Sequence, residues 1–112
     1  MLSSRLLCEL GLLEEYSRNK EYFSSFSIIK EELLKVKYKI VVHEIEYEFL
    51  ATFPKYFPYQ PIIIDKITDF WTSHSYLNGS MCLKWGRDNW DSEITLTKLL
   101  TIFMNCYLLK IL

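Results

Sequence analysis

The sequence lacks long apolar runs, an excess of either charge, and paired cysteines. Its longest apolar stretch, residues 99–112, is interrupted by polar side chains and falls short of the roughly 20 apolar residues that span a bilayer. Thirteen basic residues against 14 acidic ones give no electrostatic reason to expect nucleic acid or an anionic membrane as a partner. Three scattered cysteines argue against a disulfide framework and favour free thiols in a reducing cytoplasm.

Cofactor signatures are also absent. The chain has no glycine-rich phosphate loop, so any reaction that needs a nucleotide to activate its substrate would depend on a separate enzyme. The possible metal donors show neither Cys-x-x-Cys nor His-x-x-x-His spacing, so we expect no metal site and no cofactor; they are Cys8, His43, His74, Cys82 and Cys106. A chain of 112 residues, 50% of them hydrophobic and without repeat or linker, is expected to form one domain, residues 1–112.

The N-terminal part of the chain predicts a helix and a strand. Ser3 or Ser4 can cap a helix that ends near Asn19, with apolar side chains at helical spacing at positions 6, 10 and 13. The remaining, solvent-facing sides of this helix are expected to hold its charged residues: Arg5, Glu9, Glu14 and Glu15. Residues 22–30 are rich in aromatic and serine residues with partial alternation, which predicts an edge strand.

Two alternating segments predict a hairpin. Lysines at positions 35, 37 and 39 alternate with apolar side chains in residues 35–42, and glutamates at 44, 46 and 48 do the same in residues 44–51. If an even-length loop joins the strands, each lysine can face a glutamate on a solvated face of the sheet. The turn around Val42 and His43 has no glycine signal, so its geometry is not predicted.

The remaining elements complete an α+β domain. Residues 62–64 are apolar and β-branched, which predicts a fourth strand covered on both faces. Thr95 can cap a last helix, residues 95–112, that is apolar on nearly every side. The order predicted is an N-terminal helix, a four-stranded antiparallel meander, an active-site loop and a C-terminal helix.

Three short pieces follow neither a helical nor a strand period. Residues 53–61 read Phe-Pro-Lys-Tyr-Phe-Pro-Tyr-Gln-Pro, and their three prolines predict an extended wall that aromatic side chains pack down. The second piece begins at His74 and continues as Asn-Gly-Ser-Met-Cys-Leu in residues 78–83. The third reads Trp-Asp-Ser-Glu-Ile-Thr-Leu in residues 90–96.

In their order and spacing these pieces resemble the ubiquitin-conjugating enzyme family. The first is similar to the family's Phe-Pro-x-x-Tyr-Pro-x-x-Pro segment, with Phe57 where tyrosine is usual. The second is similar to the His-Pro-Asn segment that leads to Asn-Gly-x-Ile-Cys-Leu, and the third to Trp-Ser-Pro-x-x-Thr-Ile. The resemblance covers nearly the whole chain, implies a shortened bacterial member that lacks the last two helices, and places Cys82 at the active cysteine.

The resemblance implies a transferase. Cys82 would accept a ubiquitin-like modifier as a thioester from an activating enzyme and pass it to an amine, because a thiolate is both a good nucleophile and a good leaving group. Shortened relatives are encoded in bacterial operons beside a modifier and an activating enzyme, some linked to antiphage defence. Arg5 would meet the activating enzyme, whereas Tyr59, Asp91 and Ser92 match positions that relatives use to meet ligases.

One departure from the family pattern concerns the oxyanion that forms when an amine attacks the thioester, because this species needs a hydrogen-bond donor. The family attributes oxyanion stabilisation to the asparagine of His-Pro-Asn, but here the chain reads His74-Ser75-Tyr76, so this asparagine is absent. The Tyr76 hydroxyl, the Asn78 amide and backbone N–H groups near Cys82 stay open as donors, with Asn78 slightly preferred. His74 is expected to pin the loop by hydrogen bonds to the backbone rather than to act as a base.

Other readings stay open as well. A catalytically inactive binding or scaffold subunit would keep the fold without the cysteine chemistry, and an unrelated cysteine hydrolase would need His43 or His74 turned towards the thiol. The last helix would leave a large apolar stripe exposed, which implies a protein partner or self-association across it. The stripe comprises Ile102, Met104, Leu108 and Leu109.

Overall fold

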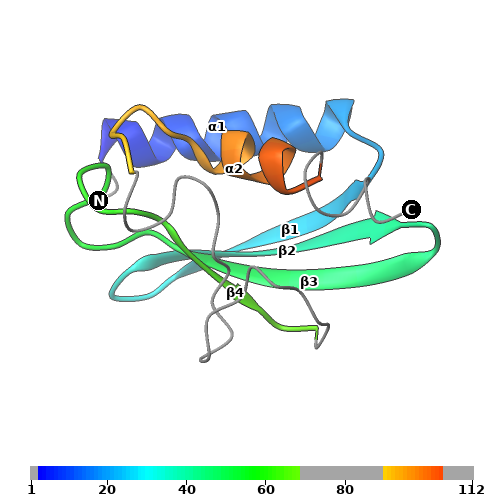
Figure 1. Ribbon diagram of the computed structural model, residues 1–112. Helices are drawn as coiled ribbons and strands as arrows, with labels where there is room; N and C mark the ends of the chain where they lie inside the picture. Colours follow the sequence, from blue (N-terminus) through cyan, green and yellow to red (C-terminus); the bar gives the residue numbers. More distant parts are fainter. Residues whose placement is uncertain (1–2, 69–89, 105–112) are drawn as a thin grey trace.

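The computed structural model describes residues 3–68 and 90–104, which form two helices and one sheet. In chain order the elements are α1 (Ser4–Asn19), β1 (Phe23–Lys30), β2 (Leu34–Val42), β3 (Ile45–Thr52), β4 (Ile63–Lys66) and α2 (Leu96–Phe103). The strands pair antiparallel in the order β1-β2-β3-β4, and both helices lie over one face of the sheet (Figure 1). The predicted α+β arrangement and the edge position of the first strand are confirmed within the described residues.

Helix α1 begins and ends as its sequence predicts, but one buried residue was assigned to the wrong face. The Ser3 hydroxyl accepts a hydrogen bond from the Leu6 amide at 3.2 Å, which identifies Ser3 as the cap. Leu13 and Tyr16 are buried, as is Glu9, whose exposed fraction is 0%. The prediction that Glu9 faces solvent is wrong, because Glu9 lies four residues before Leu13 and seven before Tyr16, on the helix's inward face.

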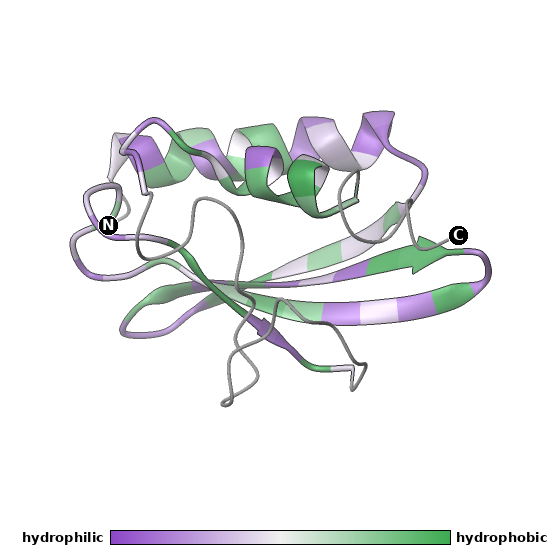
Figure 2. Ribbon diagram, in the orientation of Figure 1, coloured by the Kyte–Doolittle hydropathy of each residue, from purple (hydrophilic) through white to green (hydrophobic). Residues whose placement is uncertain are grey.

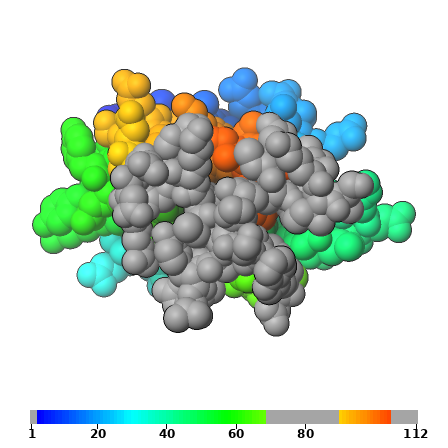
Figure 3. All heavy atoms as spheres, viewed as in Figure 1, coloured from blue at the N-terminus to red at the C-terminus, as the bar shows by residue number. Residues whose placement is uncertain are grey.

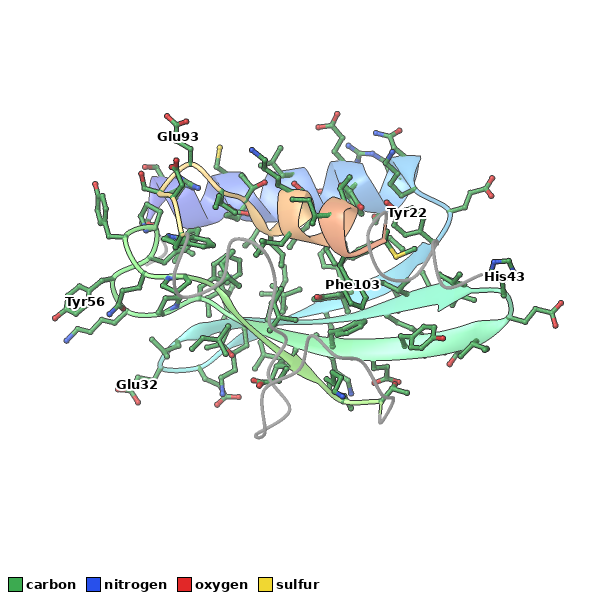
Figure 4. The ribbon with its side chains drawn as sticks, in the orientation of Figure 1. Tyr22, Glu32, His43, Tyr56, Glu93 and Phe103 are labelled. Carbon is green, nitrogen blue, oxygen red and sulfur yellow. The ribbon has the colours of Figure 1, made fainter. Side chains whose placement is uncertain are left out.

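A two-residue turn sets the register of β2 and β3. Val42 pairs with Ile45, so only His43 and Glu44 lie between the strands, with φ angles of 52° and 68°. Positive φ at both central residues matches the right-handed twist of the strands and is usually supplied by asparagine and glycine. His43 stands at the tip of this turn in Figure 4.

The charges of the hairpin pair less directly than expected. Lys39 faces Glu48, but Lys37 faces Leu50, so the prediction that each lysine faces a glutamate is wrong. The tight turn shifts the two charged rows, so the ion pairs are both direct and diagonal. Lys39 pairs with the facing Glu48 at 3.8 Å, and the diagonal pairs are Lys37 to Glu48 at 3.6 Å and Lys39 to Glu46 at 3.4 Å. Figure 2 shows the resulting bands of hydrophilic and hydrophobic residues along β3. Exposed pairs contribute up to about 1 kcal/mol each, so the buried apolar face supplies most of the stability.

The core fills the space between the sheet and the two helices. Phe103 points from α2 towards the sheet (Figure 4), where its ring meets Phe49 edge-on with centroids 5.3 Å apart. Phe49 in turn stacks on Tyr38, and burial raises the pKa of the Tyr38 hydroxyl. Side chains with at most 2% exposure come from both helices and from every strand except β4, and include Leu13, Phe23, Val36, Ile40, Ala51, Leu96, Leu99 and Leu100.

At the start of strand β4, one face is buried and the other is exposed. Ile64 is 6% exposed and pairs with the buried Ala51, whereas Ile63 is 45% exposed. Successive side chains of a strand point to opposite faces, so Ile63 lies on the face away from the helices. The expectation of cover on both faces is therefore wrong for Ile63.

Helix α2 confirms its predicted cap and corrects its predicted surface. The Thr95 hydroxyl accepts from the Lys98 amide at 3.2 Å. Met104 is fully buried, so its expected role in an exposed stripe is wrong, and Ile102 is half-buried. Leu108 and Leu109 lie outside the described residues. Among the described helices, none is long and apolar enough to cross a membrane.

Candidate functional site

The residues predicted to do the chemistry lie between the two described parts of the chain. His74, Tyr76, Asn78 and Cys82 all belong to residues 69–89, which are outside the described residues. The structure describes what holds this segment at each end. It also describes the four residues that the family resemblance assigns to partner binding.

The segment is anchored at its start by the backbone of Glu48 in β3. The amides of Ile67 and Thr68 both donate to the Glu48 carbonyl, at 2.9 and 3.2 Å. The Glu48 amide donates in return to the Thr68 hydroxyl at 2.8 Å. These three hydrogen bonds hold the last described residues before the segment against the sheet.

The proline-rich residues 53–61 form a compact, aromatic loop at one end of the sheet. The Phe57 amide donates to the Pro54 carbonyl at 3.0 Å, and the Tyr59 amide to the Tyr56 carbonyl at 2.8 Å. The peptide bond between Phe57 and Pro58 is cis. The Phe57 ring packs edge-on against the buried Phe53, with centroids 4.9 Å apart. The predicted packing of aromatic side chains is present for Phe53 and Phe57, but the prediction of an extended path is wrong, because these turns fold the loop and leave Tyr56 60% and Tyr59 81% exposed.

The segment is anchored at its other end by Trp90. The indole Nε1 donates a 2.6 Å hydrogen bond to the Pro58 carbonyl, and the indole ring lies 6.3 Å from the Phe57 ring. Figure 3 shows the atoms that follow residue 89 lying next to those of the proline-rich loop. The first and third sequence motifs are therefore in direct contact, although the hydrogen-bonded residues are 32 positions apart.

Arg5 joins α1 to this loop and to the start of α2. Its guanidinium donates to the Ile94 carbonyl at 3.0 Å and lies over the Phe57 ring, 5.2 Å from the centroid. The guanidinium also lies 3.7 Å from the carboxylate of Glu9, and 29% of the Arg5 side chain is exposed. Arg5, predicted to meet an activating enzyme, thus has three partners within the chain.

Glu9 is a buried carboxylate at the N-terminus of α2. Its Oε2 accepts a hydrogen bond from the Leu96 amide at 3.1 Å, which satisfies a helix N–H beyond the one that Thr95 caps. Its Oε1 attracts Arg5 electrostatically but has no hydrogen bond from the described residues. Burial raises the pKa of Glu9, and the Leu96 amide and Arg5 offset part of this effect. The carboxylate holds the two helices together at an electrostatic cost.

The residues predicted to meet ligases differ in their surroundings. Tyr59 is 81% exposed at the surface of the proline-rich loop. Asp91 is exposed, and its carboxylate accepts from the Glu93 amide at 2.8 Å, while Ser92 is half-buried in the same turn. The Asp91 carbonyl accepts from the Ile94 amide at 3.0 Å. The contacts described for Asp91 shape the approach to α2, and Tyr59 presents the larger free surface.

A pocket of about 490 Å³ lies between Leu6 of α1, residues 30–34 and the start of the proline-rich loop, residues 53–55. Leu6, Leu34 and Phe53 contribute apolar surface. The charged residues of the pocket are of both signs: Lys30, Glu31, Glu32 and Lys55. Arg5, Tyr59, Asp91 and Ser92 do not line it. Within the described residues no three histidine, cysteine or acidic side chains gather as a metal site would require.

Sequence reasoning missed Glu9 and the contacts of Arg5. A signal for Glu9 was present, because its position falls in the middle of the arc defined by Leu6, Leu13 and Tyr16. The hydrogen bond of Trp90 carried no comparable signal, since its acceptor is a backbone carbonyl far away in the chain.

No family model matches the chain, and no curated protein sequence matches it either. The likeness to ubiquitin-conjugating enzymes therefore rests on the three motifs and on their order. The described fold is compatible with that likeness at the level of an α+β domain.

Proposed function

We propose that the chain is a ubiquitin-like-protein conjugating enzyme that carries its modifier on Cys82. The Cys82 sulfur attacks the carbonyl carbon of a modifier held as a thioester on an activating enzyme; a new C–S bond forms and the activating enzyme's thiol leaves. An amine then attacks the same carbon, the C–S bond to Cys82 breaks, and the amine gives up a proton.

The observation that carries the proposal is the hydrogen bond from Trp90 to Pro58. It brings together the first and third motifs, and Cys82 belongs to the motif between them. The anchoring of Thr68 on Glu48 adds a fixed start to the same segment. Fixed residues on both sides of the motif, Thr68 on β3 and Trp90 on the proline-rich loop, suit a nucleophile that has to present its thiolate to two large partners in turn.

The test is a charging assay with ATP, the activating enzyme and the modifier encoded beside the chain. We expect an adduct that reductant removes from the unaltered chain, no adduct in Cys82→Ala, and a reductant-resistant ester in Cys82→Ser. Cys8→Ala is the matched control, because Cys8 is an exposed free cysteine outside the motif. Equal thioester formation in Cys82→Ala would refute the assignment.

The group that stabilises the oxyanion is tested in a second step. Asn78→Ala and Tyr76→Phe each remove one candidate donor, and the proposal assigns this work to Asn78 first. We expect Asn78→Ala to slow transfer to a free amine by about 100-fold, the usual effect of losing one such donor, while charging is unchanged. His74→Ala is expected to lower charging and transfer together, as for a residue that holds the loop.

A scaffold subunit without thioester chemistry is the second candidate. One observation favours it: Tyr76 stands where the family has its oxyanion asparagine. This candidate predicts that the unaltered chain never forms an adduct on Cys82 but still binds the activating enzyme or modifier. If charging fails and Cys82→Ala binds the activating enzyme or modifier with the same affinity as the unaltered chain, the chain is a scaffold subunit.

A further inference from the structure

Strand β1 forms an outer edge of the sheet that meets no other strand of the described residues. The outward N–H and C=O groups of such a strand are a template for another strand, so natural proteins usually block edges with proline, lysine or bulges. β1 has no proline, and its one charged residue, Lys30, is its last. Its pairing with β2 is irregular only between Phe23 and Ser25. Residues 25–29 thus form a regular, uncharged edge.

The helix side of this edge is apolar and partly open. Phe26 and Ile28 pair with Tyr38 and Val36, which are both buried, so they lie on the face that the helices cover. Yet Ile28 is 41% exposed and Phe26 is half-buried. Apolar side chains of an added strand could bury this surface.

The opposite side of the edge holds two serines and the half-buried Ile29, with three lysines of β2 behind it, two of which already pair with glutamates of β3. Ser25 and Ser27 are exposed and pair with Lys39 and Lys37 of β2. The Lys37 side chain is 48% exposed. A strand added beyond β1 would lie about 10 Å from β2, a distance that extended lysine and glutamate side chains can span across serines.

The chain contains its own example of a strand that satisfies this pattern. β3 pairs with the other side of β2 and directs Glu46 and Glu48 to the lysines, while Phe49 packs in the core. The acidic and apolar side chains of β3 alternate along the strand, as the two faces require. A partner strand on the free side of β1 would face the same two surroundings: apolar side chains on the helix side of the sheet and lysines on the other side.

We propose that the outer edge of β1 binds an extended peptide segment of another protein as an added strand, and that this segment alternates acidic and apolar residues. Main-chain hydrogen bonds to residues 25–29 supply affinity. Selectivity comes from apolar contacts with Phe26 and Ile28 on one face and from carboxylates near the lysine row on the other. None of the residues named for this surface belongs to the proline-rich loop, and the inference does not rest on the proposed transfer reaction.

The direct test uses a fluorescent, end-capped peptide of alternating valine and glutamate, titrated with the full chain. We expect saturable binding and slower amide exchange in residues 25–29. A peptide with lysine in place of glutamate is expected to bind about tenfold or more weakly, because like charges would then face each other. A peptide N-methylated at the pairing amides should not bind.

A pair of variants of the chain locates the site. Ser27→Glu puts a carboxylate beside Lys37 and should weaken binding of the valine–glutamate peptide by about tenfold. Ser24→Glu is the matched control: Ser24 is also exposed but has no pairing partner in β2, so this variant should bind the peptide as the unaltered chain does. Circular dichroism verifies that both variants are folded.

Three results would overturn the proposal. The first is no saturable binding of the valine–glutamate peptide at millimolar concentration. The second is equal weakening by Ser27→Glu and Ser24→Glu. The third is a chain that sediments as a dimer with the amides of residues 25–29 already protected, because a second copy would then occupy the edge.

Discussion

Among single residues, Glu9 links ionisation to folding. It lies fully buried between two helices, where its carboxylate accepts from the Leu96 amide and faces Arg5. Burial removes water from the carboxylate, which disfavours the charged form. The Leu96 amide and the Arg5 guanidinium favour it, but burial is the larger effect and the pKa of Glu9 is raised.

The raised pKa predicts a pH dependence of stability. A carboxyl whose pKa is higher in the folded chain binds its proton more tightly there than in the unfolded chain. The contribution of Glu9 to the free energy of unfolding therefore rises as pH falls from 7 towards its ordinary pKa of 4.5 and is lost as pH rises through the folded value. Glu9→Gln removes this contribution, and urea unfolding at several pH values measures the difference between the two chains.

The control for Glu9 is Glu14→Gln on the same helix. The Glu14 side chain is 68% exposed and pairs with Arg18, so its removal should leave the pH profile nearly unchanged. If Glu9→Gln and Glu14→Gln gave the same profile, Glu9 would not be the titrating group.

Trp90 offers a second test at the residue scale. Trp90→Phe removes the indole N–H and leaves the Pro58 carbonyl without this donor, which should cost about 1–3 kcal/mol of unfolding free energy. Tyr59→Phe is the control in the same loop, because Tyr59 is 81% exposed. Denaturant midpoints compare the two, and equal stability would mean that the contact with Pro58 contributes little.

At the scale of elements, the turn between β2 and β3 is held against the preference of its residues. His43 and Glu44 both adopt positive φ, which costs roughly 1–2 kcal/mol per residue for side chains other than glycine and, to a lesser degree, asparagine. The buried faces of the two strands compensate, because a slip by one residue would turn their apolar side chains to solvent. The burial of apolar side chains in β2 and β3 therefore fixes the two-residue turn and its positive φ angles.

The strain in this turn predicts a stabilising double substitution. His43→Asn with Glu44→Gly supplies the residues that such a turn favours and should raise the free energy of unfolding by about 1 kcal/mol. Glu21→Gly is the control, because Glu21 lies in a turn without positive φ. Thermal unfolding of the three chains measures the effect; a loss of stability in the double variant would mean that His43 and Glu44 make contacts worth more than the strain.

The helices and strands themselves were largely predictable from the sequence. Ser3 and Thr95 cap helices that begin where expected, and alternation located β2 and β3 to within one residue at each end. Local periodicity suffices for such elements because each residue's role depends on near neighbours. The register of the hairpin could not be predicted, because it depends on a turn whose residues carry no sequence signal.

Contacts between distant parts of the chain were harder to predict. Arg5 and Glu9 look like solvent-facing charges in the helix sequence, and their burial depends on where the start of α2 lies. Met104 was expected at a surface because the sequence shows which residues are apolar but not what covers them. In the candidate site, the packing of Phe57 could be predicted from the sequence, whereas the turns of the proline-rich loop and its link to Trp90 could not, because they depend on contacts that the sequence does not show.

For the whole molecule, the sheet order predicts a gradient of amide exchange. β2 has a strand on each side and contributes Val36 and Ile40, both at 0% exposure, so its amides should exchange slowest. β1 has a described neighbour on one side only, so its outward amides should exchange much faster.

Mass spectrometry or NMR of the isolated chain at low concentration measures this gradient. Fast exchange of alternate amides within residues 25–29 would mean that the outer edge of β1 is free to accept a strand. Exchange as slow as in β2 would mean that something already pairs with this edge. Dilution distinguishes the two sources of such protection, because pairing with a second copy weakens as concentration falls, whereas pairing within the chain does not.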